Sequence, residues 1–372
     1  MHAKTHTIAA EPGVAAYQLN SCHYGRPGTG RKAYIQAALH ADEVPAMLVA
    51  HVLRRELERL DSEGRILGEV ILVPAANPIG LSQVVQGMPF GRFDLGTGLN
   101  FNRAFHHVTD ELKAALAGRL GPDAAANVSL IRTEARAAIA RWEPADATAV
   151  LKKTLLSMAI DADLVLDLHC DNEARLHLYT GAALADRVRP LAALLGAHAL
   201  LLSNASGGAP FDEACGDLWW ELAAHFGEAT PIPPACAAIT VELRGEMDVR
   251  YDLAEQDARA LLQYLAREGV LDLPLAPLPE PLCEPTPLAG VERLDAPQSG
   301  VLVFLKLLGE RVAAGEAVAD VINPVSGATA TLRASRDGVL FASTAHRHLL
   351  RGMHICKIAG ATSFRSGSLL SQ

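Results

Sequence analysis

Short apolar runs alternate with longer stretches of helical period over most of the chain, from Ala33 to about Gly269. The short runs end in polar residues and have the length of buried strands, while the longer stretches repeat their apolar residues every three or four positions. This alternation is typical of the strands and helices of an α/β sheet. The predicted strands are Lys32–Leu39, Glu69–Pro74, Leu164–His169, Leu176–Tyr179 and Ala238–Glu242.

The longer stretches predict amphipathic helices. In the first of them, Leu48, Val52, Leu53 and Leu57 share one face, and the Arg and Glu residues between them can reach solvent. The predicted helices are Val44–Leu60, Leu112–Leu120, Val128–Ala140 and Leu253–Glu268.

The proline-rich segment Leu271–Pro287 cannot continue a helix or form a central strand. After it, apolar residues alternate densely and Gly-containing turns come close together, which predicts a small all-β barrel or sandwich. We therefore expect an α/β domain of residues 1–272, a linker of residues 273–287 and a C-terminal β domain of residues 288–372.

Composition narrows the range of partners and compartments. The net charge of −9 argues against a nucleic-acid partner, and the scattered Arg residues favour a small molecule. No apolar run is long enough to cross a bilayer, and the first residues do not resemble a secretory signal. The six cysteines lie far apart without a CxxC pair, which predicts reduced and mostly buried thiols. We expect a soluble, cytoplasmic protein.

Two histidines and a glutamate follow or end predicted strands. The first strand runs into His40, and Glu43 lies three residues later in the first turn of a helix. A second apolar strand ends in His169. Ligands of open α/β sheets gather at the carboxyl ends of strands, so these residues can form a His₂Glu zinc site with a fourth position for water. The alternative for His169 is a half-buried histidine bonded to a backbone carbonyl.

Two further features bear on this metal hypothesis. Asp167 and Asp171 flank His169, and either could orient its imidazole as a hydrogen-bond acceptor. The pair His225 and Glu228 repeats the HxxE spacing, but it lies in or just after a helix-like segment with no strand before it. We interpret that second pair as a chance match.

A further apolar strand ends in Glu242. A carboxylate beside a metal-bound water can take its proton and later pass it to a leaving amine. Glu242 is therefore the candidate general base. The alternative is a structural ion pair with Arg244, since Glu is common at strand ends.

A Gly- and Pro-rich stretch, Ile71–Phe105, predicts a long ordered loop, and loops of this size inside a domain are often functional. An Arg fork suits a substrate carboxylate, and a second Arg near a metal can stabilise a developing oxyanion. For Arg92, a solvated loop charge is the alternative. The candidate polar residues of this loop are Arg92, Asn100, Asn102 and Arg103.

The order HADE, NFNR, DLH and VEL resembles the zinc carboxypeptidase superfamily and, within it, the succinylglutamate desuccinylase/aspartoacylase branch. The resemblance covers roughly Lys32 to Gly269, and the predicted C-terminal β domain is similar to that of the branch. It implies a mixed, mostly parallel sheet with helices on both faces. It also implies a hydrolase that cleaves the amide bond of a small N-acyl amino acid and a chain that can form a homo-oligomer.

The resemblance also implies residue roles. His40, Glu43 and His169 would bind one Zn²⁺, and Glu242 would act as base and acid when zinc-activated water attacks the amide carbonyl. Asn102 and Arg103 would hold the α-carboxylate of the substrate, and Arg92 would face the oxyanion.

Two positions depart from the branch. Ala41 replaces a small Gly after the first His, and Leu243–Arg244 replaces a Gly after the catalytic Glu, a departure expected to alter the pocket. Two other functions remain alternatives: a metallocarboxypeptidase acting on short peptides, and a catalytically silent metal-binding protein on the same scaffold.

Overall fold

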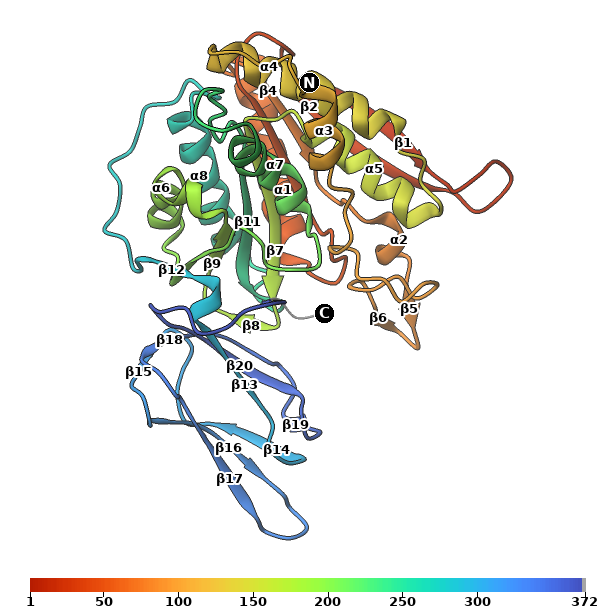
Figure 1. Cartoon of the computed structure of the whole chain (residues 1–372). Coiled ribbons are helices and arrows are strands. Elements are labelled where there is room, and N and C mark those ends of the chain that lie inside the picture. The colour runs from red at the N-terminus through yellow and green to blue at the C-terminus, as the bar shows by residue number, and fades with distance from the viewer. Residues whose placement is uncertain (370–372) are drawn as a thin grey trace.

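A nine-stranded mixed sheet forms the centre of the larger part of the molecule in the computed structural model, which describes residues 1–369 (Figure 1). Neighbouring strands pair in parallel, except for β1 with β2, β2 with β4 and β11 with β9, which are antiparallel. In spatial order the strands are β1 (His2–Ile8), β2 (Tyr17–Gly25), β4 (Glu69–Val73), β3 (Lys32–Ala37), β7 (Leu164–Asp171), β11 (Ala237–Gly245), β9 (His177–Thr180), β10 (Ala199–Leu202) and β12 (Pro285–Pro287).

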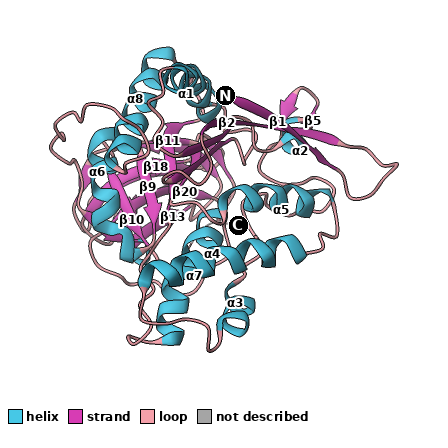
Figure 2. Ribbon diagram, turned by 90° about the horizontal axis from the view of Figure 1, so that it is seen from above, coloured by secondary structure: helices cyan, strands magenta, loops and turns pink. Residues whose placement is uncertain are grey.

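Helices cover both faces of this sheet (Figure 2). One face carries α1 (Pro45–Ser62), α6 (Ala185–Leu195) and α8 (Tyr251–Arg267). The other carries α3 (Thr109–Leu116), α4 (Ala124–Arg141), α5 (Ala147–Ala159) and α7 (Phe211–Phe226). Each face has its own buried hydrophobic cluster, so the predicted fold, a mixed and mostly parallel sheet between two layers of helices, is confirmed.

Three adjacent parallel strands, β3, β7 and β11, bring their carboxyl ends to one edge of the sheet. Ala37 of β3 pairs with Leu168 of β7, and His169 of β7 pairs with Glu242 of β11. Side chains alternate between the two faces of a strand. Val165 and Ala238 belong to the cluster on the α7 face, so His169 and Glu242, an even number of residues further on, point to that face too.

The five predicted strands and four predicted helices all exist, with ends displaced by a few residues. No element was predicted at β1 and β2, the hairpin at the sheet edge, where β1 is mostly exposed and its polar residues hide the strand pattern. The helices α5 and α6 and the short β10 were also missed. The predicted long loop, Ile71–Phe105, begins within β4 and then contains one helical turn, α2 (Pro78–Leu81), and a small hairpin of β5 (Val84–Val85) and β6 (Met88–Pro89).

The boundary predicted for the linker needs a correction. We assigned residues 273–287 to it, but the last three form β12, which pairs in parallel with β10 at the edge of the sheet. Proline lacks the N–H that a central strand must donate, and an edge strand tolerates that loss. The linker therefore ends before Pro285.

The C-terminal region is a small β-sandwich, as predicted, with its own buried core. One sheet has the order β13-β20-β18-β15, and the other β17-β16-β14-β19. Its strands are β13 (Val291–Asp295), β14 (Gly300–Phe304), β15 (Arg311–Val312), β16 (Ala317–Ile322), β17 (Thr329–Arg333), β18 (Gly338–Ser343), β19 (His348–Leu349) and β20 (His354–Ala359).

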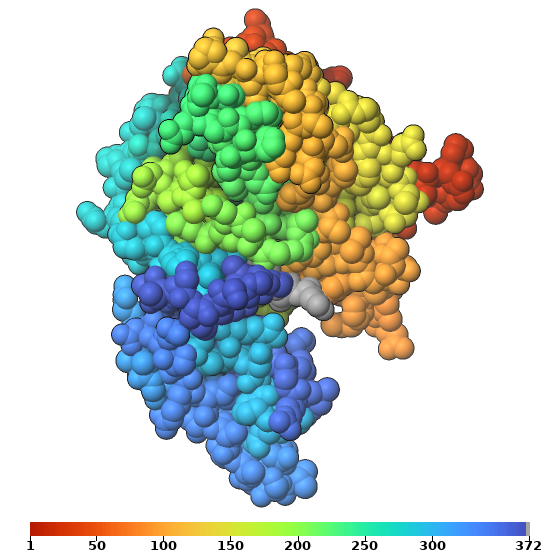
Figure 3. Space-filling model, viewed as in Figure 1, coloured from red at the N-terminus to blue at the C-terminus, as the bar shows by residue number. Residues whose placement is uncertain are grey.

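The two parts of the molecule are joined by more than the linker. The short strand β8 (Glu173–Ala174), which follows β7, pairs with β18 of the sandwich. The last described residues cross the junction as a band in Figure 3, and Leu369 donates a backbone hydrogen bond to Ser206. The sandwich is thus held close to the edge of the sheet where β7 ends.

Two smaller expectations can be compared with the structure. Five of the six cysteines are buried and none is paired, in line with the predicted reduced thiols. Among residues 1–369, no helix combines the length and apolar character needed to cross a membrane.

Candidate metal and active site

His40 and Glu43 lie in the turn between β3 and α1. Nε2 of His40 is 2.8 Å from Oδ1 of Asn100, and that oxygen also accepts a hydrogen bond from the backbone N–H of Asn102 at 2.8 Å. The second contact fixes the amide orientation of Asn100, so Nε2 of His40 carries the proton. Nδ1 of His40 is left with a lone pair, 2.8 Å from Oε1 of Glu43.

His169 is held in the same manner by different residues. Its Nε2 lies 2.9 Å from Oδ2 of Asp167, while its Nδ1 lies 2.8 Å from Oε2 of Glu43. Asp167 accepts a hydrogen bond from Gln36, which in turn accepts one from Tyr34. Of the two aspartates that we considered for orienting His169, the structure selects Asp167.

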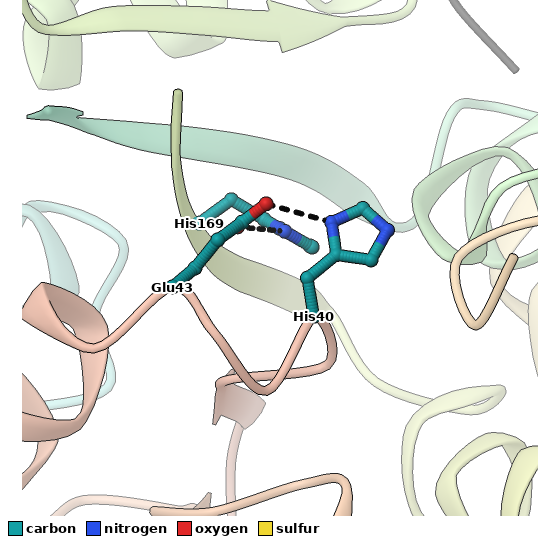
Figure 4. Close-up of side chains that lie close together, drawn as sticks. All are labelled: His40, Glu43 and His169. Carbon is teal, nitrogen blue, oxygen red and sulfur yellow. Dashed lines mark hydrogen bonds and ion pairs between the residues drawn. The ribbon is translucent and has the colours of Figure 1, made fainter. Parts of the chain in front are cut away.

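His40, Glu43 and His169 together form a buried cluster whose ligand atoms all lie within 4.8 Å of one another (Figure 4). One ring nitrogen of each imidazole faces an oxygen of the Glu43 carboxylate, and a bound cation would replace the proton that lies between His169 and Glu43. Two nitrogens and a carboxylate oxygen are also the donor set that divalent transition metals prefer. The residues present therefore fit a metal ion.

The charges of this cluster are strongly coupled. Burial disfavours the carboxylate of Glu43, but the two imidazoles outweigh it and hold its pKa well below the usual range. Burial also disfavours a charged His169, yet Asp167 and Glu43 raise its pKa well above the usual range. The site thus holds Glu43 as an anion ready to bind a cation.

Glu242 lies beside this cluster, in register with His169 on the neighbouring strand. Its Oε2 is buried without a hydrogen-bond partner among the described residues. Burial, reinforced by the charge of Glu43, raises the pKa of Glu242 to about 8. A carboxyl group with a pKa near neutrality can both accept and release a proton, which is what general acid–base chemistry requires.

The alternative role that we considered for Glu242, an ion pair with Arg244, is absent. Arg244 instead forms two hydrogen bonds with Asp257 of α8, at 2.7 and 2.8 Å. Leu243 is buried in the core on the opposite face of the sheet. The expectation that Leu243–Arg244 would alter the pocket was wrong, because neither residue lines the cavity described below.

Arg92 reaches the cluster from the long loop. Its Nη1 lies 3.2 Å from Oε1 of Glu43 and 3.4 Å from Nδ1 of His40. The guanidinium is therefore paired with the cluster, although 37% of the side chain stays exposed. A guanidinium at this distance can stabilise negative charge that develops on a substrate oxygen.

Asn102 and Arg103 come from the same loop. Oδ1 of Asn102 accepts the backbone N–H of Phe211, the first residue of α7, at 2.9 Å, and its Nδ2 lies 3.4 Å from Nε2 of His169. The contact with Phe211 joins Asn102 to the start of α7. Arg103 extends along Gly208, where a Cβ would lie 2.6 Å from Cδ of the arginine, so a side chain at Gly208 would displace it.

One cavity of about 250 Å³ contains all seven predicted site residues: His40, Glu43, Arg92, Asn102, Arg103, His169 and Glu242. By contrast, His225 and Glu228, the second HxxE pair, are exposed at the end of α7, in keeping with a chance match.

The cavity also has walls that the sequence did not reveal. His354 and Lys357 of β20 reach it from the C-terminal sandwich, and Asp212, Asp217 and Trp220 line it from α7. No local pattern marks these residues as functional. Only the alternation of HICKIA, which places Lys357 among buried strand residues, could have singled out the lysine.

The sequence of the chain was compared with protein families and with curated proteins. Residues 29–128 match the family described as Succinylglutamate desuccinylase/Aspartoacylase catalytic domain. No curated protein is significantly similar to the chain. The matched range includes His40, Glu43, Arg92, Asn102 and Arg103, but it ends before His169 and Glu242.

Solved structures match almost the whole chain. A succinylglutamate desuccinylase/aspartoacylase family protein from Shewanella amazonensis gives a TM-score of 0.82 at 26% identity, covering 96% of this chain and 98% of that one. A protein similarly described from Shewanella frigidimarina gives 0.81 at 24% identity, covering 96% and 97%. The ectoine utilization protein EutE (DoeB) from Ruegeria pomeroyi, in a product-bound structure, gives 0.64 at 17%, covering 94% and 89%, and shares the fold.

Proposed function

Because the chain belongs to the succinylglutamate desuccinylase/aspartoacylase family, a family of hydrolases, we propose that it is a zinc-dependent amidohydrolase of small N-acyl amino acids. The carbon–nitrogen bond that it cleaves is a non-peptide amide. The products are a carboxylic acid and a free amino acid, and neither nucleic acid nor membrane takes part.

The observation that carries this proposal is the relation between the metal cluster and Glu242. His40, Glu43 and His169 present their ligand atoms to one point. Glu242, in register with His169, adds a carboxyl group to the same cavity without being part of the cluster. A metal site next to a separate base is the arrangement used for hydrolysis, whereas a purely structural metal site has no use for the base.

We assign the roles as follows. A zinc ion held by His40, Glu43 and His169 would supply Lewis acidity, which polarises a carbonyl group and makes water more acidic. Glu242 takes the proton of the attacking water and gives it to the nitrogen of the leaving amine.

The residues of the long loop stabilise charge on the substrate and fix its position. Arg92 stabilises the negative charge that develops on the carbonyl oxygen. Arg103, with the side-chain amide of Asn102, holds the α-carboxylate of the substrate and thereby sets the distance between the scissile bond and Glu242.

The substitution Glu242→Gln tests the proposal. It keeps the shape of the side chain but removes the proton acceptor, so hydrolysis of N-acetyl, N-succinyl and N-formyl amino acids should fall by roughly 10²- to 10⁴-fold. Bound zinc, measured by elemental analysis, should stay at one per chain. Glu228→Gln, an exposed carboxylate in the second HxxE pair, is the matched control and should behave like the wild type.

Three results would overturn the proposal. Hydrolysis unchanged in Glu242→Gln would remove the assigned base. Turnover confined to dipeptides and longer peptides would identify a metallocarboxypeptidase. A zinc-loaded wild type that cleaves no member of either panel would identify a silent metal-binding protein.

A further inference from the structure

The first two turns of α7 place three carboxylates in the cavity, from Asp212, Glu213 and Asp217. Glu213 and Asp217 are four residues apart and therefore neighbours on one side of the helix. Trp220 lines the cavity one turn further on. We call these four residues the α7 wall.

Most other charges that line the cavity are paired with each other. Arg92 lies 3.2 Å from Glu43, and Lys357 lies 2.6 Å from Asp171. Arg103 also lines the cavity, and the charges of Asp212 and Glu213 act on its guanidinium. The three carboxyl groups of the α7 wall lie close together on this side of the cavity, where a bound cation would stabilise their ionised forms.

Three residues on this side of the cavity have a polar group without a hydrogen-bond partner among residues 1–369: Asp217, Ser206 and Trp220, through its indole N–H. Asp217 is 4% exposed, and its Oδ1 has no hydrogen-bond partner among residues 1–369. Ser206, which faces the same space and is 3% exposed, has an unpartnered hydroxyl. Burying such groups without partners costs free energy, and a ligand that donates hydrogen bonds recovers it.

Trp220 gives this region an aromatic surface. A Cβ at Gly181 would lie 2.4 Å from its ring, and one at Gly216 would lie 3.2 Å from it. The two glycines thus make room for the indole beside the carboxylates. An aromatic face next to carboxylates favours an organic cation, because the ring quadrupole also attracts positive charge.

The wall stands close to the reacting centre. Asp212 accepts a hydrogen bond from the hydroxyl of Thr240, which points to the same face of β11 as Glu242. Two residues along a strand span about 6.6 Å. A group that binds at the wall is therefore about one amino-acid side chain away from a scissile bond next to Glu242.

We propose that the α7 wall binds an ammonium group on the amino-acid part of the substrate, so that the preferred substrates are N-acyl derivatives of basic amino acids. The inference rests on the proposed function. An α-carboxylate held by Arg103, whose side chain lies against the loop that leads into α7, directs the amino-acid side chain toward Asp217 and Trp220. The ammonium group replaces the missing partners of Asp217 and Ser206.

A matched substrate series tests the inference on the zinc-loaded enzyme. Nα-acetyl-L-lysine and Nα-acetyl-L-ornithine carry the ammonium group, N-acetyl-L-norleucine is a neutral analogue of similar shape, and N-acetyl-L-glutamate reverses the charge. We expect kcat/KM to favour the basic substrates over norleucine by about 10- to 100-fold, the range of a charge-assisted hydrogen bond, and over glutamate by more.

Asp217→Asn should reduce this preference, measured as the ratio of kcat/KM for Nα-acetyl-L-lysine to that for N-acetyl-L-norleucine, by about 10-fold or more. Glu221→Gln removes the same charge from an exposed position of α7 outside the cavity and should keep the preference. Equal kcat/KM values for the lysine and norleucine derivatives, or a preference for the glutamate derivative, would refute the binding of an ammonium group at the α7 wall. The proposed hydrolase function would not be affected.

Calorimetry with the products L-lysine and L-norleucine distinguishes a failure of the ammonium-binding inference from a failure of the proposed function. Suppose that no acyl amino acid is cleaved, yet the zinc-loaded protein binds L-lysine more tightly than L-norleucine and Asp217→Asn abolishes the difference. Binding of an ammonium group at the α7 wall would then be supported, and the proposed hydrolase function would be refuted. If neither hydrolysis nor selective binding occurs, both are refuted.

Discussion

Nζ of Lys357 lies 2.6 Å from Oδ2 of Asp171, so a residue of the C-terminal sandwich forms an ion pair with the strand that carries His169. Burial alone would lower the pKa of Lys357, but Asp171 raises it above its usual range, and the lysine stays charged. Both residues line the cavity. The sandwich is therefore a wall of the candidate active site.

Replacing Lys357 with Met should lower kcat/KM by about 10-fold and destabilise the protein by about 2 kcal/mol, because Asp171 keeps a largely buried charge without a partner. Lys306→Met, which breaks an ion pair with Glu316 away from the cavity, is the control. Thermal unfolding and steady-state kinetics measure both effects. The sandwich would lose its assigned role if the two variants behaved alike.

The contact between Asp167 and His169 predicts a loss of metal affinity in Asp167→Asn. A weaker acceptor on Nε2 makes the imidazole a poorer ligand, and the dissociation constant for Zn²⁺ should rise by about 10- to 100-fold. Competition with a chromogenic chelator measures it. Asp171→Asn removes the same charge at the same distance along the strand without touching the imidazole, so a loss as large in that variant would contradict the prediction.

The buried Asp217 should make the free energy of unfolding depend on pH. Burial, together with the charges of Glu213 and Asp212, raises its pKa to about 9. A raised pKa means that the folded state holds the proton more tightly than the unfolded chain. This group therefore stabilises the fold fully below about pH 4, and the contribution is lost as the pH rises toward 9.

Asp217→Asn has no such loss. It should be more stable than the wild type at pH 8 by on the order of 2 kcal/mol, with a difference near zero at pH 4 to 5. Thermal unfolding at several pH values measures the difference, and Glu228→Gln, an exposed carboxylate that does not act on Asp217, should show none of it. A constant difference, or one that shrinks as the pH rises, would refute the prediction. A stabilised variant that binds its substrate less well would mark Asp217 as a functional residue.

The pattern along the chain determined the fold class, the ends of the central strands and the seven candidate site residues. Those features are local, because a strand that ends in a polar residue is visible in a few consecutive positions. His40, Glu43, His169 and Glu242 each follow or end such a strand, and parallel strands must bring these ends to one edge of the sheet. The short motifs HADE, NFNR, DLH and VEL added the order in which the family uses them.

Only the tertiary structure decided which side chains meet across large separations in sequence. It selected Asp167 over Asp171 as the partner of His169, paired Arg244 with Asp257, and brought Lys357 and the α7 wall to the cavity. None of these contacts follows from periodicity, because each depends on how helices and a second domain pack against the sheet. The cluster of His40, Glu43 and His169 could thus be predicted from sequence, while the cavity walls formed by α7 and β20 could not.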